Sequence, residues 1–447
     1  MTFMHYEEIQ KKESNMGLLN KKAHFITIDN NGLIQQFKHL NIHGINTMLI
    51  TDKNGIERFR RLNFKNIYLI PVFQQKILTF FKQKQKNTTN WSNNDIFQQK
   101  GKKVIEEIPK LNTKREQRII SEIAIRAVYA LNLDYALVKV GVTVGEKPWI
   151  LYVNPTIEGN EKIEELFNVA IQEFLTKWNQ LLSASSYKVT LGADPEFVLR
   201  GPSGQLILAS QYLPKKGLVG CDDIWTNHDR SQLPLGEFRP IPSEDPKKLL
   251  INLYRTMLLG SKKIRNTHVE WLAGALPIKG YPIGGHVHFS HIWLNSFLLR
   301  ALDNYLTLPI FLLEDPNGKG RRPKYGFLGD YREQFHGGFE YRTLPSWIVS
   351  PTITKGVFAL AKIIAENYIY LYQNPLQEIE IQRAYYEGDK DAIRPVVEGL
   401  WEELKQLKDY QTYQSYLNPL KNLIDRDYSW DENKDIRKLW KLPPYHK

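Results

Sequence analysis

The chain has 447 residues and a mass of 52.2 kDa, which is long enough for two or three domains with separate cores. Its apolar share of 42% fits a folded protein, and its formal net charge is +12. No apolar run reaches the roughly 20 residues that span a bilayer, no secretion signal is visible, and the single cysteine, Cys221, excludes an internal disulfide, so we expect a cytoplasmic protein that does not enter a membrane.

The excess positive charge lies mainly in residues 1–185, which hold 26 Lys and Arg against 18 Asp and Glu. A basic surface attracts nucleic acids, nucleotides, acidic peptides or cell-wall polymers. No nucleic-acid-binding motif accompanies the charge, so a solvated basic surface is the simpler interpretation. Nucleic acid is therefore not the expected partner.

The N-terminal residues predict a small α/β unit. Strand-like segments lie at 24–28, 46–52 and 66–73, and helix-like segments lie between them at 33–41 and 56–64. This order is the rhythm of strand–helix–strand units. No glycine-rich phosphate loop follows the first strand, so we expect no nucleotide site here.

A segment rich in Lys, Gln and Asn, residues 84–112, is interpreted as a long loop or linker. An amphipathic helix follows over 113–131, and two strand-like runs come next. The second run ends in Asn154-Pro155, which resembles the closing segment of ATP-grasp enzymes. Tyr152-Val153 replaces the metal-binding Glu of that segment, so we interpret it as a structural remnant without a catalytic role. A helix over 161–182 then leads to a domain boundary near residue 185.

The rest of the chain predicts a second domain over 186–376 and a charged helical C-terminal extension over 377–447. Helices are expected from Ser243, as N-cap, to about residue 265, and again over 291–313 and 352–372. No internal repeat is evident.

Four short segments share one pattern, in which two chemically potent residues are separated by one residue in β-prone surroundings. They are Asp194-Pro195-Glu196, Glu237-Phe238-Arg239, His286-Val287-His288 and Glu340-Tyr341-Arg342. Residues i and i+2 of a strand point to the same face, so a sheet built from all four segments would gather these side chains on one face. Because desolvating charges is costly unless a ligand compensates them, the pattern predicts a site for metal ions and a highly charged substrate.

Each pair also has a simpler interpretation on its own. Pro195 cannot donate to a ladder, which favours an edge strand or a bulge. Glu237 and Arg239 fit a surface ion pair. His286 and His288, which follow two glycines, suit a metal site. A cupin barrel is disfavoured because no Glu follows His288 within a few residues.

A glycine-rich segment between Gly318 and Arg332 adds four cations, Arg321, Arg322, Lys324 and Arg332. A flexible basic loop can wrap phosphates, which Arg binds bidentately, although alone this segment would be interpreted as a solvated loop. It lies close in sequence to Glu340. Carboxylates with divalent cations, together with these arginines, would hold a polyphosphate such as ATP.

Taken together, the motifs G-x-D-P-E-F, G-E-x-R-P, G-G-H-x-H, R-R-x-x-Y-G-x-x-G-D-Y-R and E-Y-R-x-L-P-S-W resemble the phage- and Firmicutes-type carboxylate–amine ligases. These enzymes belong to the amidoligase superfamily, related to glutamine synthetase and glutamate–cysteine ligase. The resemblance covers about residues 188–350. One departure is G-C-D-D-I before Glu237, where relatives tend to have G-x-D-G.

The resemblance implies an α+β fold: a glutamine synthetase-like curved antiparallel sheet with helices on its outer face, and Mg²⁺ or Mn²⁺ and ATP on its inner face. The smaller α/β domain precedes it. The implied metal ligands are Asp194, Glu196, Glu237, His286 and Glu340, and Asp194 could instead only shape its strand. The implied ATP-binding residues are Arg321, Arg322, Lys324, Tyr325, Arg332 and His288. The implied catalytic residues are Arg332, Arg342 and Glu340.

The implied reaction is ATP-dependent formation of an amide or peptide bond through an acyl phosphate, with Asp223 or Asp330 as a candidate base. The partners are then a carboxylate and an amine, and the basic N-terminal domain would present an acidic peptide or a cell-wall polymer. The alternatives are a metal-dependent hydrolase built on His286 and His288, and an inactive binding protein of the same fold. The sequence names neither substrate and encodes no recognisable subunit interface.

Overall fold

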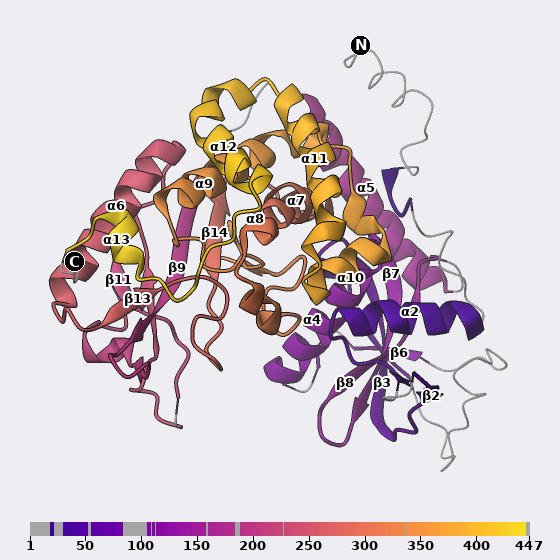
Figure 1. Ribbon diagram of the computed structural model, residues 1–447. Coiled ribbons are helices and arrows are strands. Elements are labelled where there is room, and N and C mark those ends of the chain that lie inside the picture. Colours follow the sequence, from indigo (N-terminus) through magenta and orange to yellow (C-terminus); the bar gives the residue numbers. More distant parts are fainter. Residues whose placement is uncertain are drawn as a thin grey trace. The chain divides into compact units, whose positions relative to one another are not determined.

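The computed structural model in Figure 1 divides the chain into two compact units, Met1–Ala184 and Ser185–Lys447, and each is described by itself. The structure describes residues 18–21, 30–51, 55–83, 105–108, 110–111, 113–157, 160–183, 188–226, 228–335 and 337–443. The strand predicted at 24–28 lies outside these residues.

Unit 1 is built on a six-stranded sheet with the order β6–β5–β3–β7–β8, to which β4 adds beside β3. The strands are β3 (Phe64–Phe73), β4 (Lys76–Ile77), β5 (Phe80–Gln83), β6 (Ile105–Ile108), β7 (Tyr135–Thr143) and β8 (Pro148–Asn154). A separate pair is formed by β1 (Leu49–Thr51) and β2 (Glu57–Phe59), and the helices are α2 (Asn30–Ile42), α4 (Lys114–Ala130) and α5 (Glu161–Ser183). All named strand pairs among the described residues of this unit are antiparallel, so these strands form no parallel pair of the kind that a strand–helix–strand unit creates.

Two local predictions for unit 1 are wrong. The segment 56–64 contains strand β2 instead of a helix, because the first residue of its helical spacing is not buried: Ile56 is 59% exposed, whereas Phe59, Leu62 and Phe64 are partly buried against the core. Residues 84–104 of the predicted loop lie outside the described residues, and the prediction is wrong for 105–108, which form strand β6 and pair with β5. By contrast, the helix predicted over 113–131 is confirmed as α4, with Thr113 as its N-cap.

Unit 2 is built on an eight-stranded sheet with the order β11–β12–β9–β14–β16–β15, and β10 and β13 also pair with β9. The strands are β9 (Thr190–Arg200), β10 (Leu206–Ile207), β11 (Val219–Cys221), β12 (Leu235–Phe238), β13 (Glu270–Leu272), β14 (Gly285–Ser290), β15 (Tyr331–Glu333) and β16 (Phe339–Tyr341). All these pairs are antiparallel. The four polar-paired segments therefore lie on or directly beside four neighbouring strands, β12, β9, β14 and β16, as predicted.

The edge-strand interpretation of Pro195 is wrong, because β9 is a central strand with β12 and β14 on its two sides. The bulge interpretation fits the register on the β12 side: Leu191 bridges Ser243 whereas Glu196 pairs with Glu237, so the facing segment contains one extra residue. Pro195 is tolerated there because Glu196 directs its N–H to Gly284 on the β14 side, so the missing N–H of Pro195 falls on the irregular side. Its last partner on β14 is Gly285, whereas the pairing with β12 begins one residue later, at Glu196. The missing N–H therefore leaves no gap in a continuous ladder.

Helices cover the sheet face opposite the polar pairs. The helices of this unit are α6 (Pro246–Lys263), α7 (Ser296–Leu302), α8 (Leu308–Leu313), α9 (Pro351–Asn367), α10 (Ile379–Glu387), α11 (Lys390–Gln406), α12 (Tyr410–Asp425) and α13 (Ile436–Trp440). Among them, α10, α11 and α12 pack on other helices. Phe197 and Phe238 stack at 4.4 Å between ring centroids, and Phe238 packs under Gly260 of α6. Tyr341 reaches Thr307, in the π-helical turn between α7 and α8. These contacts bury the apolar face, so the α+β architecture is confirmed.

Capping residues set where these helices begin. Asp245 is the N-cap of α6 and accepts a hydrogen bond from the Lys247 N–H, so the predicted N-cap at Ser243 is two residues early. Ser350 caps α9 in the same way, and proline follows directly in both helices. The stretch Ser296–Leu313 is apolar and long enough to cross a membrane, but 89% of it is buried inside the fold, as expected for a core helix.

Candidate active site

The register of the sheet gathers the predicted side chains on one face. It pairs Glu237 with Glu196, Asp194 with His286, and Glu340 with both His288 and Arg332. Residues directly opposite each other in antiparallel strands share a face, as do residues i and i+2. All of these side chains therefore point to the same side of the sheet, which the sequence pattern predicted.

The two imidazoles lie among carboxylates. Nδ1 of His286 is 3.1 Å from Oδ1 of Asp194 and 3.0 Å from Oε1 of Glu340. Its Nε2 is 3.9 Å from Oε1 of Glu196. Nε2 of His288 is 3.0 Å from Oδ2 of Asp194. Three strands thus bring three carboxylates and two histidines into direct contact.

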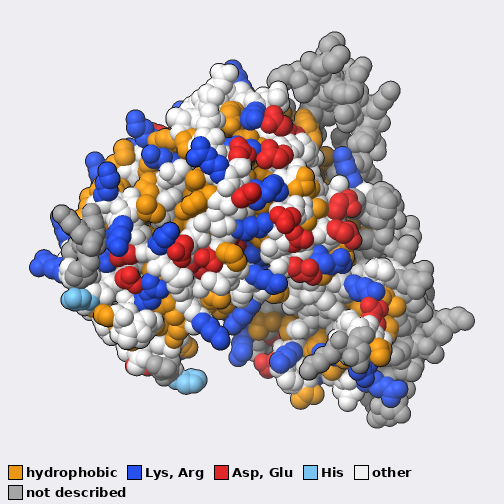
Figure 2. Space-filling view, viewed as in Figure 1, with side chains coloured by type: hydrophobic (Ala, Val, Ile, Leu, Met, Phe, Trp, Pro, Cys, Tyr) orange, Lys and Arg blue, Asp and Glu red, His pale blue; other side chains and the backbone are white. Residues whose placement is uncertain are grey.

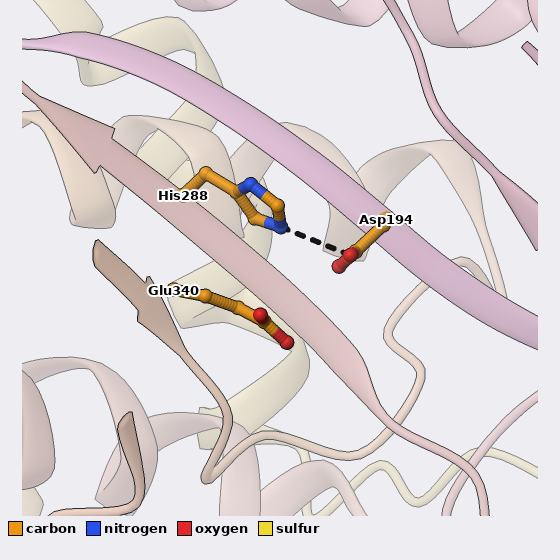
Figure 3. A group of neighbouring side chains, drawn as sticks. All are labelled: Asp194, His288 and Glu340. Atoms are coloured by element: carbon orange, nitrogen blue, oxygen red, sulfur yellow. Dashed lines mark ion pairs between the residues drawn. The ribbon is translucent and has the colours of Figure 1, made fainter. Parts of the chain in front are cut away.

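Asp194, His288 and Glu340 form a group that could hold a divalent cation. Each offers one ligand atom, and these atoms all lie within 4.8 Å of one another, as Figure 3 shows. Among the described residues, Oε1 of Glu340 and Nε2 of His288 are buried without a well-aligned hydrogen bond. Carboxylate oxygens with an imidazole nitrogen suit Mg²⁺ or Mn²⁺, and the residues present therefore fit such an ion.

Burial and the crowding of carboxyl groups shift the pKa values on this face. Burial raises the pKa of Glu196 to about 7, and burial together with the nearby Asp194 raises the pKa of Glu237 to about 10. Burial alone would lower the pKa of His286, but Asp194 outweighs it and raises this pKa to about 9. For the same reason the pKa of Asp194 falls below its usual range despite burial, because of His286 and His288. A site of this kind favours a cationic ligand.

Arginines line the edge of the site at β15 and β16. Nε of Arg342 is 3.1 Å from Oε1 of Glu340, and Nη1 of Arg332 is 3.4 Å from Oε2 of the same carboxylate. Nε2 of Gln334 donates to that second oxygen at 3.0 Å. The side chain of Arg332 is 58% exposed, so its guanidinium can also contact an anionic ligand.

A family model described as phage phiEco32-like COOH.NH2 ligase-type 2 matches residues 191–442, which is more than half of the chain. The protein belongs to this ligase family. The resemblance found in the motifs is therefore confirmed, and the match extends beyond residue 350 across the C-terminal helices.

Solved structures give weaker similarities to the ligase. A bifunctional glutathione synthetase from Pasteurella multocida is 8% identical with a TM-score of 0.34, over 57% of this chain and 51% of that chain. A novel glutamine synthase homolog is 12% identical with a TM-score of 0.27, over 61% and 74% of the two chains. The ligase thus spans about half the length of the glutathione synthetase. No curated protein matches it.

Asp222 lies at the candidate site, and the sequence pattern did not single it out. Its N–H continues the ladder beyond β11 by donating to the carbonyl of Leu235 at 3.1 Å. It follows Gly220, which pairs with Glu237, by two residues and therefore lies on the same face as that carboxylate. Its charge contributes to the raised pKa of Glu237. The available signal was the acidic doublet Asp222-Asp223 directly after a β-prone run.

The two candidate bases lie at the periphery of the site. The side chain of Asp223 is 82% exposed, and its Oδ1 is 2.9 Å from Nζ of Lys215. Asp330 lies 3.9 Å from Nη1 of Arg342, at the arginine edge of the site.

The structure gives Arg321 and Arg322 internal partners, so the prediction of a flexible phosphate-binding loop is wrong for them. Arg321 donates to the carbonyls of Thr343 and Leu344. Arg322 is paired with buried Glu314 at 2.7 Å. Both guanidiniums therefore stabilise the packing of this segment against the residues they contact.

Two other residues of the predicted nucleotide-binding segment remain at the surface. Lys324 and Tyr325 are both exposed, and Nζ of the lysine lies 5.2 Å from the centre of the Tyr325 ring.

At the opposite edge of the site, Arg239 binds Glu237 and the carbonyls of Cys221 and Gly217. That guanidinium partly compensates the acidic edge.

Proposed function

We propose that the protein is an ATP-dependent carboxylate–amine ligase that activates its acid as an acyl phosphate and then closes an amide or peptide bond. Membership of the ligase family supports a reaction between a carboxylate and an amine. The observation that carries ATP dependence is the contact of one buried carboxylate, Glu340, with both the histidine cluster and the exposed Arg332. A cation site directly beside an arginine suits a polyphosphate.

In this proposal, Asp194, His288 and Glu340 hold Mg²⁺ or Mn²⁺, with Glu196 and Glu237 at the adjoining acidic edge. When bound, the cation neutralises charge on the phosphate oxygens. Arg332 binds the terminal phosphate of ATP. Arg342, whose guanidinium contacts Glu340 from the same strand end, adds positive charge where the phosphoryl group is transferred.

The reaction has two steps. A carboxylate oxygen of the substrate attacks the terminal phosphorus, ADP leaves, and the acyl phosphate forms. The amine then attacks the acyl carbon, and inorganic phosphate leaves as the amide bond closes. The amine must lose a proton, and Asp222 suits this role better than Asp223, because it shares the functional face with Glu237 whereas Asp223 is ion-paired with Lys215.

The substrates belong to broad classes. The basic charge of the first 185 residues suits an acidic peptide or a cell-wall polymer that unit 1 would select or present to the ligase. The buried, reduced Cys221 is compatible with work in the cytoplasm.

The test measures ADP release with Mn²⁺ or Mg²⁺ across a panel of acids and amines. We expect Glu340→Gln to lower turnover by at least about 100-fold, because it removes a charge shared by the cation group and both arginines. Asp223→Asn is the matched control, since it removes an exposed carboxylate near the same site, and should retain activity. Wild-type turnover in Glu340→Gln, or zinc-dependent peptide hydrolysis without ADP formation, would contradict the proposal, and the latter would favour the hydrolase.

A further inference from the structure

The last described residues form a strap across unit 2, defined here as residues 429–442, which include α13. In Figure 1 this yellow segment runs from α12 to α13 beside β13. Trp430 N–H donates to the carbonyl of Leu313 at 3.0 Å, and Nε1 of Trp440 donates to the carbonyl of Ile348 at 2.8 Å. Arg437 donates to the carbonyl of Val269. The strap is therefore an integral part of the fold.

Glu432 is the buried carboxylate at the centre of the strap, with only 1% of the residue exposed. Its two oxygens accept the backbone N–H groups of Ala275 and Leu276, the second at 2.9 Å. Its own N–H donates to Oδ2 of Asp315 at 3.2 Å. The buried carboxyl group of Glu432 holds these two backbone amides in place, because losing its oxygens would leave both N–H groups buried without an acceptor.

Hydrogen bonds through Ser346 connect the loop held by Glu432, at Ala275 and Leu276, to the backbone of Glu196. The carbonyl of Gly274, directly before Ala275, accepts the N–H of Ser346 at 2.8 Å. The hydroxyl of Ser346 then donates to the backbone carbonyl of Glu196 at 2.5 Å. Two hydrogen bonds thus join the loop to the backbone of this site residue.

A second series of hydrogen bonds connects the same loop to the Glu196 side chain. The carbonyl of Ala275 accepts the N–H of Ile283 at 3.0 Å. The next residue, Gly284, donates its N–H to Oε2 of Glu196 at 2.7 Å, and its carbonyl accepts the Glu196 N–H at 2.9 Å. One carboxylate oxygen of Glu196 is therefore oriented by a loop that is anchored at its other end by Glu432.

Contact between loop and strap is close. Gly274 has a φ of +124°, and a Cβ at that position would run into the carboxyl group of Glu432. The loop therefore follows the strap without an intervening side chain.

We propose that Glu432 is a positioning residue for Glu196: by holding the amides of Ala275 and Leu276 it fixes the loop that orients the Glu196 carboxylate, and so sets the affinity of the site for a divalent cation. The cation part rests on the proposed function. The mechanical part, that Glu432 controls the loop, does not.

The experiment compares Glu432→Gln with Asp431→Asn in the full-length protein. Gln keeps the shape but turns one acceptor into an N–H₂ group facing a backbone N–H. Asp431 is the neighbouring carboxylate of the same strap. Its side chain is 44% exposed, and its Oδ2 lies 3.8 Å from Nζ of Lys434. We expect faster hydrogen–deuterium exchange over residues 274–284 and about tenfold weaker Mn²⁺ binding in Glu432→Gln only. Turnover at saturating Mn²⁺ should stay within about twofold, since only cation affinity is affected.

Unchanged exchange and unchanged Mn²⁺ affinity, with only a lower melting temperature, would overturn the proposal, because a merely structural residue behaves in that way. If the wild type binds no Mn²⁺, the proposed function fails while the exchange comparison still decides the mechanical part. Should Glu432→Gln not fold, Trp430→Phe removes the 3.4 Å hydrogen bond from Nε1 to Glu432 and should shift exchange and affinity in the same direction. Wild-type values of both in Trp430→Phe would then count against the proposal.

Discussion

At the residue scale, the alternation of side chains along a strand separates neighbours with the same chemistry. Asp222 and Asp223 are adjacent acids after β11, yet only Asp222 lies on the face of Glu237. Asp223 is exposed and paired with Lys215. Position relative to the sheet, and not residue type, therefore decides which of the two belongs to the site.

This difference makes a direct prediction. Asp222→Asn should lower turnover by about 100- to 10,000-fold, because general-base groups contribute about that much. Asp223→Asn should stay close to wild type, since it removes only an exposed ion pair. Steady-state ADP release by both variants under the same conditions provides the measurement. Equal activities would remove Asp222 from the mechanism.

At the element scale, spacing along the sequence predicted which strands carry the site but not how other elements serve it. The i, i+2 pairs of β9 and β14 were readable because a strand has a period of two. The burial of Arg321 and Arg322 could not be predicted from the sequence. Their partners are the carbonyls of residues 343 and 344 and the buried Glu314, which no local pattern marks. Long-range pairing of this kind is set by tertiary packing.

The strap makes a pH prediction at this scale. Burial, with a contribution from Asp315, raises the pKa of Glu432 to about 7 in the folded protein, against an ordinary value near 4.5. The folded state therefore binds more protons between these values, and stability falls as pH rises through this window. The free energy of unfolding of the wild type, relative to Glu432→Gln, should drop by about 2–3 kcal/mol from pH 5 to pH 8.

Urea unfolding of both proteins at several pH values checks this expectation. Subtracting the variant removes the contributions of titrating groups that do not contact the loop held by Glu432, such as Glu237, because they are common to both proteins. A difference that is flat, or that grows toward pH 8, would show that Glu432 is already ionised at pH 5 in the folded state.

At the scale of the whole molecule, every described residue of the candidate site lies in unit 2. The family match from 191 to 442 falls in the same unit. On the face of unit 2 seen in Figure 2, basic and acidic side chains are interspersed, whereas a nucleic-acid-binding surface carries a continuous basic stripe. Cation and nucleotide binding are thus expected from unit 2, and selection of the acid or amine from unit 1.

A truncated protein tests this division. Residues 185–447 should bind Mn²⁺ and an ATP analogue within about threefold of the full-length affinity, because unit 2 has a core of its own. Ligation of an acidic substrate should weaken. Isothermal titration of both proteins provides the comparison, with Glu340→Gln as the control for binding at the site. Loss of nucleotide binding on truncation would assign part of the nucleotide site to unit 1.

Strand β9 also limits how the site can vary among related chains. Asp194 belongs to the half of the sheet paired with β14, and Glu196 to the half paired with β12. Only the two-residue step across Pro195, about 7 Å of backbone, separates them. A single inserted residue there would turn one carboxylate to the helix-covered side and reverse every side chain beyond it. The length of this step is therefore fixed by the alternation of side chains along the strand.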